Sequence, residues 1–393
     1  MKRILVILFL VSIVLTGLFL YSWKTASAAA LSPQQAHSAC KTWTALASPN
    51  PGTGSNSLSG VAAVGPGNIW AVGSYSNGSG GFPLIEHRNH GRWTVVSSPG
   101  VAGSLSGIAA IAGNNMWAVG ENDSAGMQET LIEHWNGKAW EIVSSPNFAP
   151  TGNMLAAISV VSASDIWAVG TTTSASSSSG YQPLIEHWNG TVWSLSSNPA
   201  ISGRLFSVAA ISVNDAWAVG WSSAPNVTQT LTEHWNGTQW SIVSSPNPSF
   251  INVLNSVVKI SANNVWAAGD DTLSPAPSAD YTPLIEHWDG TKWSVVSAFL
   301  QGSSDQLAGM AAVSSHDIIV VGDYRTSLDP QGPYFTLVEQ WNGTQWNGVN
   351  SPSPGSLDSD LAAAARVPKT NHVWAVGSTF DGATYGTLTE KGC

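Results

Sequence analysis

The stretch Trp70-Ala71-Val72-Gly73 decides the fold, because it returns along the chain at nearly regular intervals. Further copies begin at Trp117, Trp167, Trp217, Trp266 (as Trp-Ala-Ala-Gly), Ile319 (as Ile-Val-Val-Gly) and Trp374. The intervals between copies are 47, 50, 50, 49, 53 and 55 residues. Repeats with a period of about 40–50 residues are typical of structural units that stack around a ring.

Each unit contains four short extended segments separated by turn signals. In the fourth unit we expect strands over residues 205–211, 216–221, 230–235 and 240–244, with a loop over 222–229. Asn236-Gly237 between the last two strands is a tight-turn dipeptide of the type I′ kind, which needs positive φ at both positions. Four strands per unit predict an all-β chain, a seven-bladed β-propeller of four-stranded antiparallel blades.

Most tryptophans occupy fixed positions of this unit, 18 of the 20 in the chain. One interpretation is a surface that binds sugar or choline. The regular placement favours a structural ladder between blades, in which each ring buries roughly 150–250 Å².

The two ends of the chain supply one blade between them. Residues 43–48 resemble a fourth strand, because they read like the segment that begins at Trp240, yet no first three strands precede them. Residues 361–365, 372–377 and 386–390 supply three strands, after which the chain ends. We therefore expect the N-terminal strand to complete the last blade, which leaves no free sheet edge at the seam.

Only two cysteines are present, Cys40 and Cys393, and the repeat places both in the missing turn of this split blade. A disulfide between them would replace the covalent turn and stabilise the ring by up to about 5 kcal/mol. The alternative is that Cys40 accepts a lipid, although His37-Ser38-Ala39 is a poor lipobox.

Residues 1–30 have the features of a targeting segment. Lys2 and Arg3 precede an apolar run over residues 4–20, and Ala26-Ser27-Ala28 fits a signal-peptidase site. We predict a signal peptide, or an N-terminal anchor if the segment is retained, followed by the propeller over residues 31–393. The protein is then secreted, extracellular or on the cell surface, and any membrane contact is through an uncleaved segment.

The charge balance and one dipeptide narrow the function. With 14 basic residues and a net charge of −10, the chain is a poor binder of nucleic acid.

Glu-His recurs in five units, beginning with Glu86-His87, and would suggest metal or acid–base sites. One copy per blade cannot converge on a single zinc, so we interpret each Glu as a structural acceptor for backbone or Trp N–H donors between blades. The Asn-Gly-Thr triplets at Asn189, Asn236 and Asn342 fit a glycosylation sequon, but they also suit the hairpin turn.

The unit resembles kelch-like and tectonin-type propeller repeats, and it is similar to bacterial secreted proteins with repeated Trp-Ala-Val-Gly and Glu-His-Trp-Asn-Gly. The resemblance covers residues 40–393 and implies the propeller fold. The kelch Gly-Gly doublet is missing, and Ser164-Asp165-Ile166-Trp167 lacks the glycine of a sialidase Asp box. Because both cysteines belong to the seam, copper chemistry of the galactose-oxidase type is not expected.

We expect function on the variable connections that follow the second strands and join the blades, because binding residues concentrate on loops held by a rigid scaffold. In the last three units these loops combine acidic and aromatic side chains. The candidate ligand-binding residues are Asp270, Asp271, Asp280, Tyr281, Asp305, Asp323, Tyr324, Tyr334, Asp358, Asp360 and Tyr385. They suit carbohydrate or a cationic protein segment, with Ca²⁺ as a further candidate since it prefers carboxylate oxygens. The alternative is that these loops are simply solvated.

These observations predict an extracellular, non-catalytic binding or scaffold propeller, expected to be a monomer, whose ligand is carbohydrate or protein. No catalytic residue stands out. The alternative is a lyase or hydrolase that acts on polysaccharide at a site over the central channel. Such an enzyme needs converging carboxylates with perturbed pKa.

Overall fold

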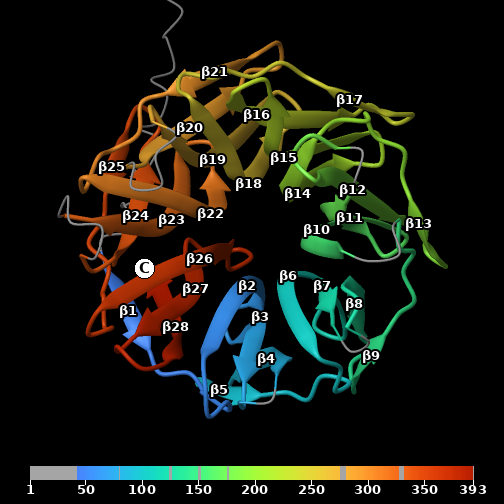
Figure 1. Ribbon diagram of the computed structural model, residues 1–393. Coiled ribbons are helices and arrows are strands. Elements are labelled where there is room, and N and C mark those ends of the chain that lie inside the picture. The colour runs from blue at the N-terminus through green and yellow to red at the C-terminus, as the bar shows by residue number, and fades with distance from the viewer. Residues whose placement is uncertain are drawn as a thin grey trace, which may run out of the picture. The chain divides into compact units, whose positions relative to one another are not determined.

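The computed structural model describes residues 42–78, 80–123, 126–148, 152–174, 177–274, 280–326 and 332–392. Within the unit that comprises Ser38–Cys393, the strands form antiparallel four-stranded blades arranged around a ring (Figure 1). The predicted all-β, seven-bladed propeller is confirmed.

Every blade follows one strand order from the channel outward. The first strands are β2 (Asn56–Gly65), β6 (Gly103–Ala112), β10 (Asn153–Ser162), β14 (Gly203–Ser212), β18 (Ile251–Ser261), β22 (Ser304–Ser314) and β26 (Asp358–Arg366). The second strands are β3 (Asn68–Ser76), β7 (Asn115–Asn122), β11 (Asp165–Thr173), β15 (Asp215–Ala224), β19 (Asn264–Thr272), β23 (Asp317–Arg325) and β27 (Val373–Phe380). The third strands are β4 (Gly81–Asn89), β8 (Glu129–Trp135), β12 (Tyr181–Trp188), β16 (Val227–Trp235), β20 (Thr282–Trp288), β24 (Phe335–Trp341) and β28 (Tyr385–Gly392). The fourth strands are β5 (Arg92–Val95), β9 (Trp140–Ile142), β13 (Trp193–Leu195), β17 (Trp240–Ile242), β21 (Trp293–Val296), β25 (Trp346–Gly348) and β1 (Trp43–Leu46).

The glycine of the repeated motif is required by close strand approach. A Cβ on Gly73 would lie 2.0 Å from the carbonyl oxygen of Ser57 on the neighbouring strand. The glycines that end the other copies meet the same obstacle within 1.9–2.1 Å. The motif therefore keeps glycine because no side chain fits there, in addition to any backbone preference.

The fourth blade corrects two sequence expectations. Of Asn236 and Gly237, only Gly237 adopts a positive φ, of 93°, because the Asn236 side chain shapes the turn by accepting the N–H groups of Thr238 and Gln239 at 3.0 Å. Residues 222–229 were expected to form a loop, but β15 and β16 continue pairing through Ser223–Thr228 as far as Ala224 and Val227. The hairpin closes over two residues, Pro225 and Asn226, and Asn226 adopts a φ of 64°. Proline sets the first turn position and asparagine tolerates the left-handed one, so the polar composition concealed a tight turn.

The hydrophobic core is divided into clusters that each join two neighbouring blades. Trp70 of the first blade packs edge-on against Trp140 of the second, with ring centroids 5.8 Å apart. Burial of one such ring contributes about 4–6 kcal/mol by area. Where the motif is degraded, Ile319 packs in a cluster with Trp43 instead. The regular tryptophans are thus structural, as the repeat predicted.

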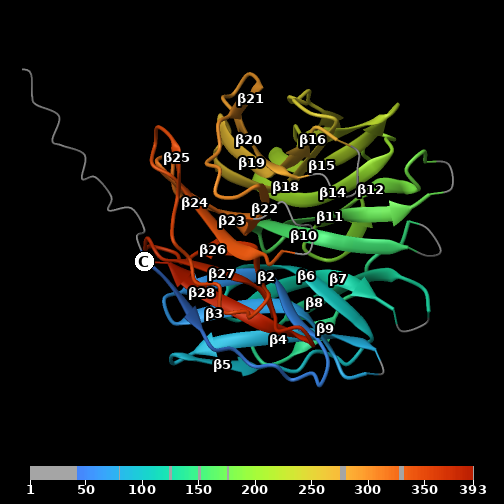
Figure 2. The ribbon, with the colours of Figure 1, turned by 60° about the vertical axis from the view of Figure 1, so that its left-hand side comes forward.

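The seam closes as expected. β1 pairs with β28 through Trp43–Gly392 and Thr44–Lys391, and the two strands lie side by side in both views (Figures 1 and 2). The N–H of Thr387 donates to Oδ1 of Asn50 at 2.8 Å. Thr230 makes the equivalent bond to Asn247 at 2.7 Å inside a continuous blade. The split blade therefore reproduces the contacts of an unbroken one.

Two predictions fall outside the described residues. The targeting segment lies in residues 1–30, and both cysteines of the proposed disulfide lie at positions 40 and 393. The part of the chain that the structure describes contains no helix with the length and hydrophobicity of a membrane span.

Candidate functional site

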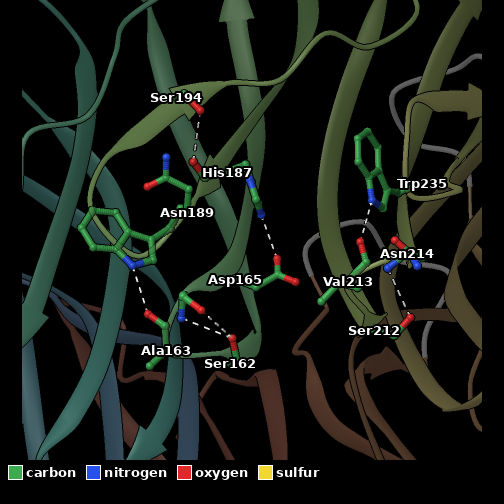
Figure 3. Close-up of polar contacts among 12 residues, drawn as sticks. Ser162, Ala163, Asp165, His187, Asn189, Ser194, Ser212, Val213, Asn214 and Trp235 are labelled. Carbon is green, nitrogen blue, oxygen red and sulfur yellow. Dashed lines mark hydrogen bonds and ion pairs between the residues drawn. The ribbon is translucent and has the colours of Figure 1, made fainter.

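The repeated histidines have structural partners. His187 Nε2 lies 2.8 Å from Asp165 Oδ1 at the start of the neighbouring strand (Figure 3). His87 makes the same contact with Asn68 at 2.8 Å and stacks on Trp70 with a centroid distance of 3.9 Å. Within the described part of the chain, no three His, Cys, Asp or Glu side chains are placed to hold a metal ion.

The glutamate that precedes the histidine in five blades is fully buried, and so are its counterparts Glu339 and Glu390 in the other two. Ser98 Oγ donates to Glu133 at 2.7 Å, and the Phe299 N–H donates to Glu339 at 3.1 Å. Of the two expected kinds of donor, a backbone N–H is found at Glu339, but no tryptophan N–H donates to these glutamates among the described residues. Trp135 Nε1, for example, donates to the Gly113 carbonyl. Burial raises the pKa of Glu86 to about 8, so this carboxyl is protonated at neutral pH.

Five of the eleven candidate residues come together in a cavity of about 230 Å³ between the sixth and seventh blades. We call it the acidic pocket, and its lining is Gln306, Asp323, Tyr334, Asp358, Asp360 and Tyr385. Five of these six residues were predicted from the sequence. Gln306 was missed because a single glutamine carries no chemical signature, although its register position opposite Asp323 would have indicated it.

Asp323 is the least compensated carboxylate of the pocket. Burial raises its pKa to about 8, and the negative charges of Asp360, Asp270, Asp305 and Asp358 add to the effect in that order. Its carboxylate accepts no hydrogen bond from the residues that the structure describes. A carboxyl group in this state releases its proton to solvent when a cation binds beside it, because a nearby positive charge favours the ionised form.

The other two carboxylates of the pocket are hydrogen-bonded. Asp360 accepts from Ser378 Oγ at 2.6 Å, and burial still raises its pKa. Asp358 accepts from the backbone N–H of Tyr334 at 2.9 Å. These bonds fix two carboxylates beside Asp323, while Tyr385, 42% exposed, borders the pocket and packs on Phe380 at 4.8 Å.

Three further candidate acids lie outside the pocket and hold loops or neighbouring strands. Asp270 of the fifth blade accepts a hydrogen bond from the Leu307 N–H of the sixth at 2.7 Å, and burial raises the pKa of Asp270 to about 7. Asp305 accepts from the N–H groups of the preceding turn, at 2.7 and 2.8 Å. Asp271 accepts from the hydroxyl of Thr282. These hydrogen bonds indicate that the three acids stabilise the loops and strands around them.

The remaining candidates also lie outside the acidic pocket. Asp280 lies 3.5 Å from Nη2 of Arg325, which is itself buried. The Tyr281 carbonyl accepts from the N–H of Asp305 at 3.0 Å, so it joins the fifth and sixth blades. Tyr324 packs on Phe335 with centroids 5.5 Å apart.

The central channel has a different chemistry. Its cavity of about 200 Å³ is lined by the first strands of all blades, including Gly60, Gly107, Ala157 and Gly309. The described lining includes no carboxylate. The carboxylates with raised pKa that an enzyme over the channel would need lie in the acidic pocket instead.

The sequence matches no protein-family model and no curated protein. Solved structures share the fold. A YCF48 structure bound to D1 peptide superposes with a TM-score of 0.55 at 14% identity, over 88% of this chain and 94% of that one. The WD40 propeller of Doa1 gives 0.56 at 12%, over 89% and 97%. An ulvan lyase of family PL25, bound to -[GlcA(1-4)Rha3S]-, gives 0.55 at 10%, over 88% and 95%. At these identities the likeness establishes the propeller alone.

Proposed function

We propose that this chain is a secreted, monomeric, non-catalytic binding propeller, and that its ligand is a protein segment whose lysine or arginine enters the acidic pocket. The observation that carries the proposal is the carboxylate of Asp323. It is partly buried among other acids and has no hydrogen-bond donor in the described structure. A ligand ammonium or guanidinium would supply the missing donor and charge.

The pocket favours a basic protein segment over neutral carbohydrate. Hydroxyl groups would bond the carboxylates without relieving their mutual repulsion, whereas one cation does both. Tyr334 and Tyr385 add apolar area at the border, as in interfaces that anchor on aromatic side chains. The YCF48 neighbour binds a peptide, which is consistent with this use of the fold.

The test is calorimetric titration of the full chain with the peptide (Gly-Lys)₃, with (Gly-Gln)₃ as the uncharged control. Asp323→Asn should weaken binding of the lysine peptide at least tenfold. The matched control is Asp289→Asn, since five blades already carry asparagine at this exposed turn. Equal affinity of Asp323→Asn and the unsubstituted chain would refute the proposal.

Proton release gives a second readout of the same site. Because the pKa of Asp323 is raised to about 8, a bound cation should expel its proton below that pH. The apparent affinity should therefore increase from pH 6 to 9. Calcium serves as a separate arm: a Ca²⁺ response that survives Asp323→Asn would assign the metal elsewhere.

A second candidate function rests on the same cavity. Asp323 and Asp360 share one pocket and both have raised pKa values, which a general acid needs. A lyase or hydrolase acting on polysaccharide would therefore work between the sixth and seventh blades. Release of reducing ends or unsaturated products from uronate-containing polysaccharide, lost in Asp323→Asn, would favour this enzyme over a binding module.

A further inference from the structure

The acidic pocket includes one of seven equivalent strand-pair positions that repeat around the ring. In each blade the residue before the buried leucine of the first strand pairs with the residue after the motif glycine. We call these the rim pairs: Ser57–Ser74, Ser104–Glu121, Met154–Thr171, Arg204–Trp221, Val253–Asp270, Gln306–Asp323 and Asp360–Ser378. They lie two residues before the segments that line the channel. The ring thus offers seven equivalent positions with different side chains.

One rim pair reverses the charge of the acidic pocket. Arg204 of the fourth blade occupies the position that Asp360 has in the seventh. Its guanidinium carbon lies 3.5 Å from the ring centroid of Tyr181 on the third blade. Trp221 lies directly opposite Arg204, and residues so paired project from the same face of a sheet. The guanidinium therefore lies over Tyr181, and Trp221 is its neighbour on the same face of the fourth blade.

Arg204 has no counter-ion. Its Nε is buried without a hydrogen-bond partner, and no ion pair or hydrogen bond joins its guanidinium to any described residue. Arg325 of the sixth blade, which also lies over a tyrosine, differs because Asp280 approaches it at 3.5 Å. A partly buried cation without an anion costs free energy in the unliganded protein.

We propose that Arg204, with Tyr181 and Trp221, forms an anion site for a carboxylate attached close to a flat apolar group. The guanidinium holds two parallel N–H donors for a carboxylate, while its face remains on the tyrosine. Trp221 offers the surface for the apolar part. The site is distinct from the acidic pocket, from which it is separated by the fifth blade.

The source of the carboxylate follows from the other rim pairs. Glu121, Asp270, Asp323 and Asp360 all belong to rim pairs, so a chain with many negative charges would favour their neutral forms and be repelled by each of them that is ionised. A protein segment of mixed charge meets no such conflict. This step rests on the proposed function: the segment whose basic residue enters the acidic pocket carries an acidic residue, next to an aromatic one, that reaches Arg204.

The anion site is tested by itself with benzoate, which joins a carboxylate to a flat ring. In the full chain labelled with ¹⁵N-arginine, the Arg204 Nε–Hε signal should shift and saturate with benzoate and not with benzamide. Arg204→Lys should weaken binding at least fivefold and Arg204→Gln should abolish it. Arg366→Gln is the matched control, since exposed Arg366 donates to the Thr370 carbonyl. An unchanged Arg204 signal overturns the anion site.

The link between the two sites is tested with peptides that carry one lysine and a Glu-Phe pair at increasing separation. At one separation, replacing Glu by Gln should weaken binding tenfold, and Arg204→Gln should erase that difference. If no peptide separation shows this behaviour, the proposal that one segment occupies both sites is overturned. Benzoate binding without any lysine-peptide binding overturns the proposed function and leaves the anion site. Lysine-peptide binding that Asp323→Asn removes, without a benzoate shift, supports the proposed function and overturns the anion site.

Discussion

The buried glutamates make the stability of the ring depend on pH. Glu86 is 0% exposed, neither carboxylate oxygen has a hydrogen-bond partner among the described residues, and burial raises its pKa from 4.5 to about 8. The folded state therefore holds this proton more tightly than the unfolded chain does. The free energy of unfolding should be highest below pH 4.5, should fall as the pH rises toward 8, and should level off above it.

The size of the effect follows from the shift. A rise from 4.5 to about 8 corresponds to a loss on the order of 5 kcal/mol for one carboxyl between pH 4.5 and 9. Glu86→Gln keeps the shape of the side chain and removes its ionisation. The variant should therefore lose less stability than the unsubstituted protein between these pH values, and the difference should grow with pH.

The assay is urea unfolding followed by tryptophan fluorescence at pH 5, 6, 7, 8 and 9. Glu141→Gln is the control, because Glu141 is exposed on the second blade and should leave the pH profile unchanged. The comparison uses the slope with pH, so a small constant cost of the amide does not matter. Parallel profiles for Glu86→Gln and the unsubstituted protein would show that Glu86 does not titrate in the folded ring.

Three further predictions concern the ring itself. Gly73→Ala should lower the free energy of unfolding by about 1–3 kcal/mol or more, since its Cβ meets a carbonyl oxygen, while Gly67→Ala, with open space, should not; urea curves of both would decide. Thr387→Val removes the hydroxyl contacts with Ser48, Pro49 and Asn50 at the seam and should cost about 1–3 kcal/mol, as should Thr230→Val in a continuous blade. A much smaller cost at the seam, measured by urea unfolding, would mean that β1 detaches readily. Cys40→Ser should lower the melting temperature under oxidising conditions and make it insensitive to reductant; a melting temperature unaffected by reductant in the unsubstituted protein would refute the disulfide.

The fold could be predicted from the sequence because the repeat states the same constraint seven times. The motif glycine, the first-strand leucine that pairs with it and the fourth-strand tryptophan each recur at one position of the unit. A misreading of one unit therefore cannot alter the predicted fold. Strand limits were less certain, as Pro225 and Asn226 show: a polar stretch reads as a loop until the pairing of β15 and β16 is known. The borrowed strand was visible because residues 43–48 repeat a known part of the unit.

The site was only partly predictable, for a physical reason. Acidic residues on the variable loops were easy to find, but the sequence could not show which of them find a donor. Asp305 and Asp270 accept backbone N–H groups, whereas Asp323 accepts none within the described structure. Arg204 was overlooked because an isolated arginine has no motif. Only its register opposite Trp221 and its contact with Tyr181 distinguish it.

A raised pKa does not by itself mark function in this ring. Glu86 and Asp323 have pKa values raised to about 8, and burial is the first cause in both. Glu86 has a counterpart in every blade, so its burial belongs to the way blades pack, and no single ligand can explain seven copies. The position of Asp323 varies from blade to blade: it holds serine, threonine or tryptophan in four others and a hydrogen-bonded acid, Glu121 or Asp270, in two. Only Asp323 among these three acids lacks a donor in the described structure, and charges of neighbouring acids add to its shift. In a repeat protein, the perturbed group that breaks the repeat is therefore the better candidate for ligand binding, and the same reasoning selects Arg204 among its seven equivalents.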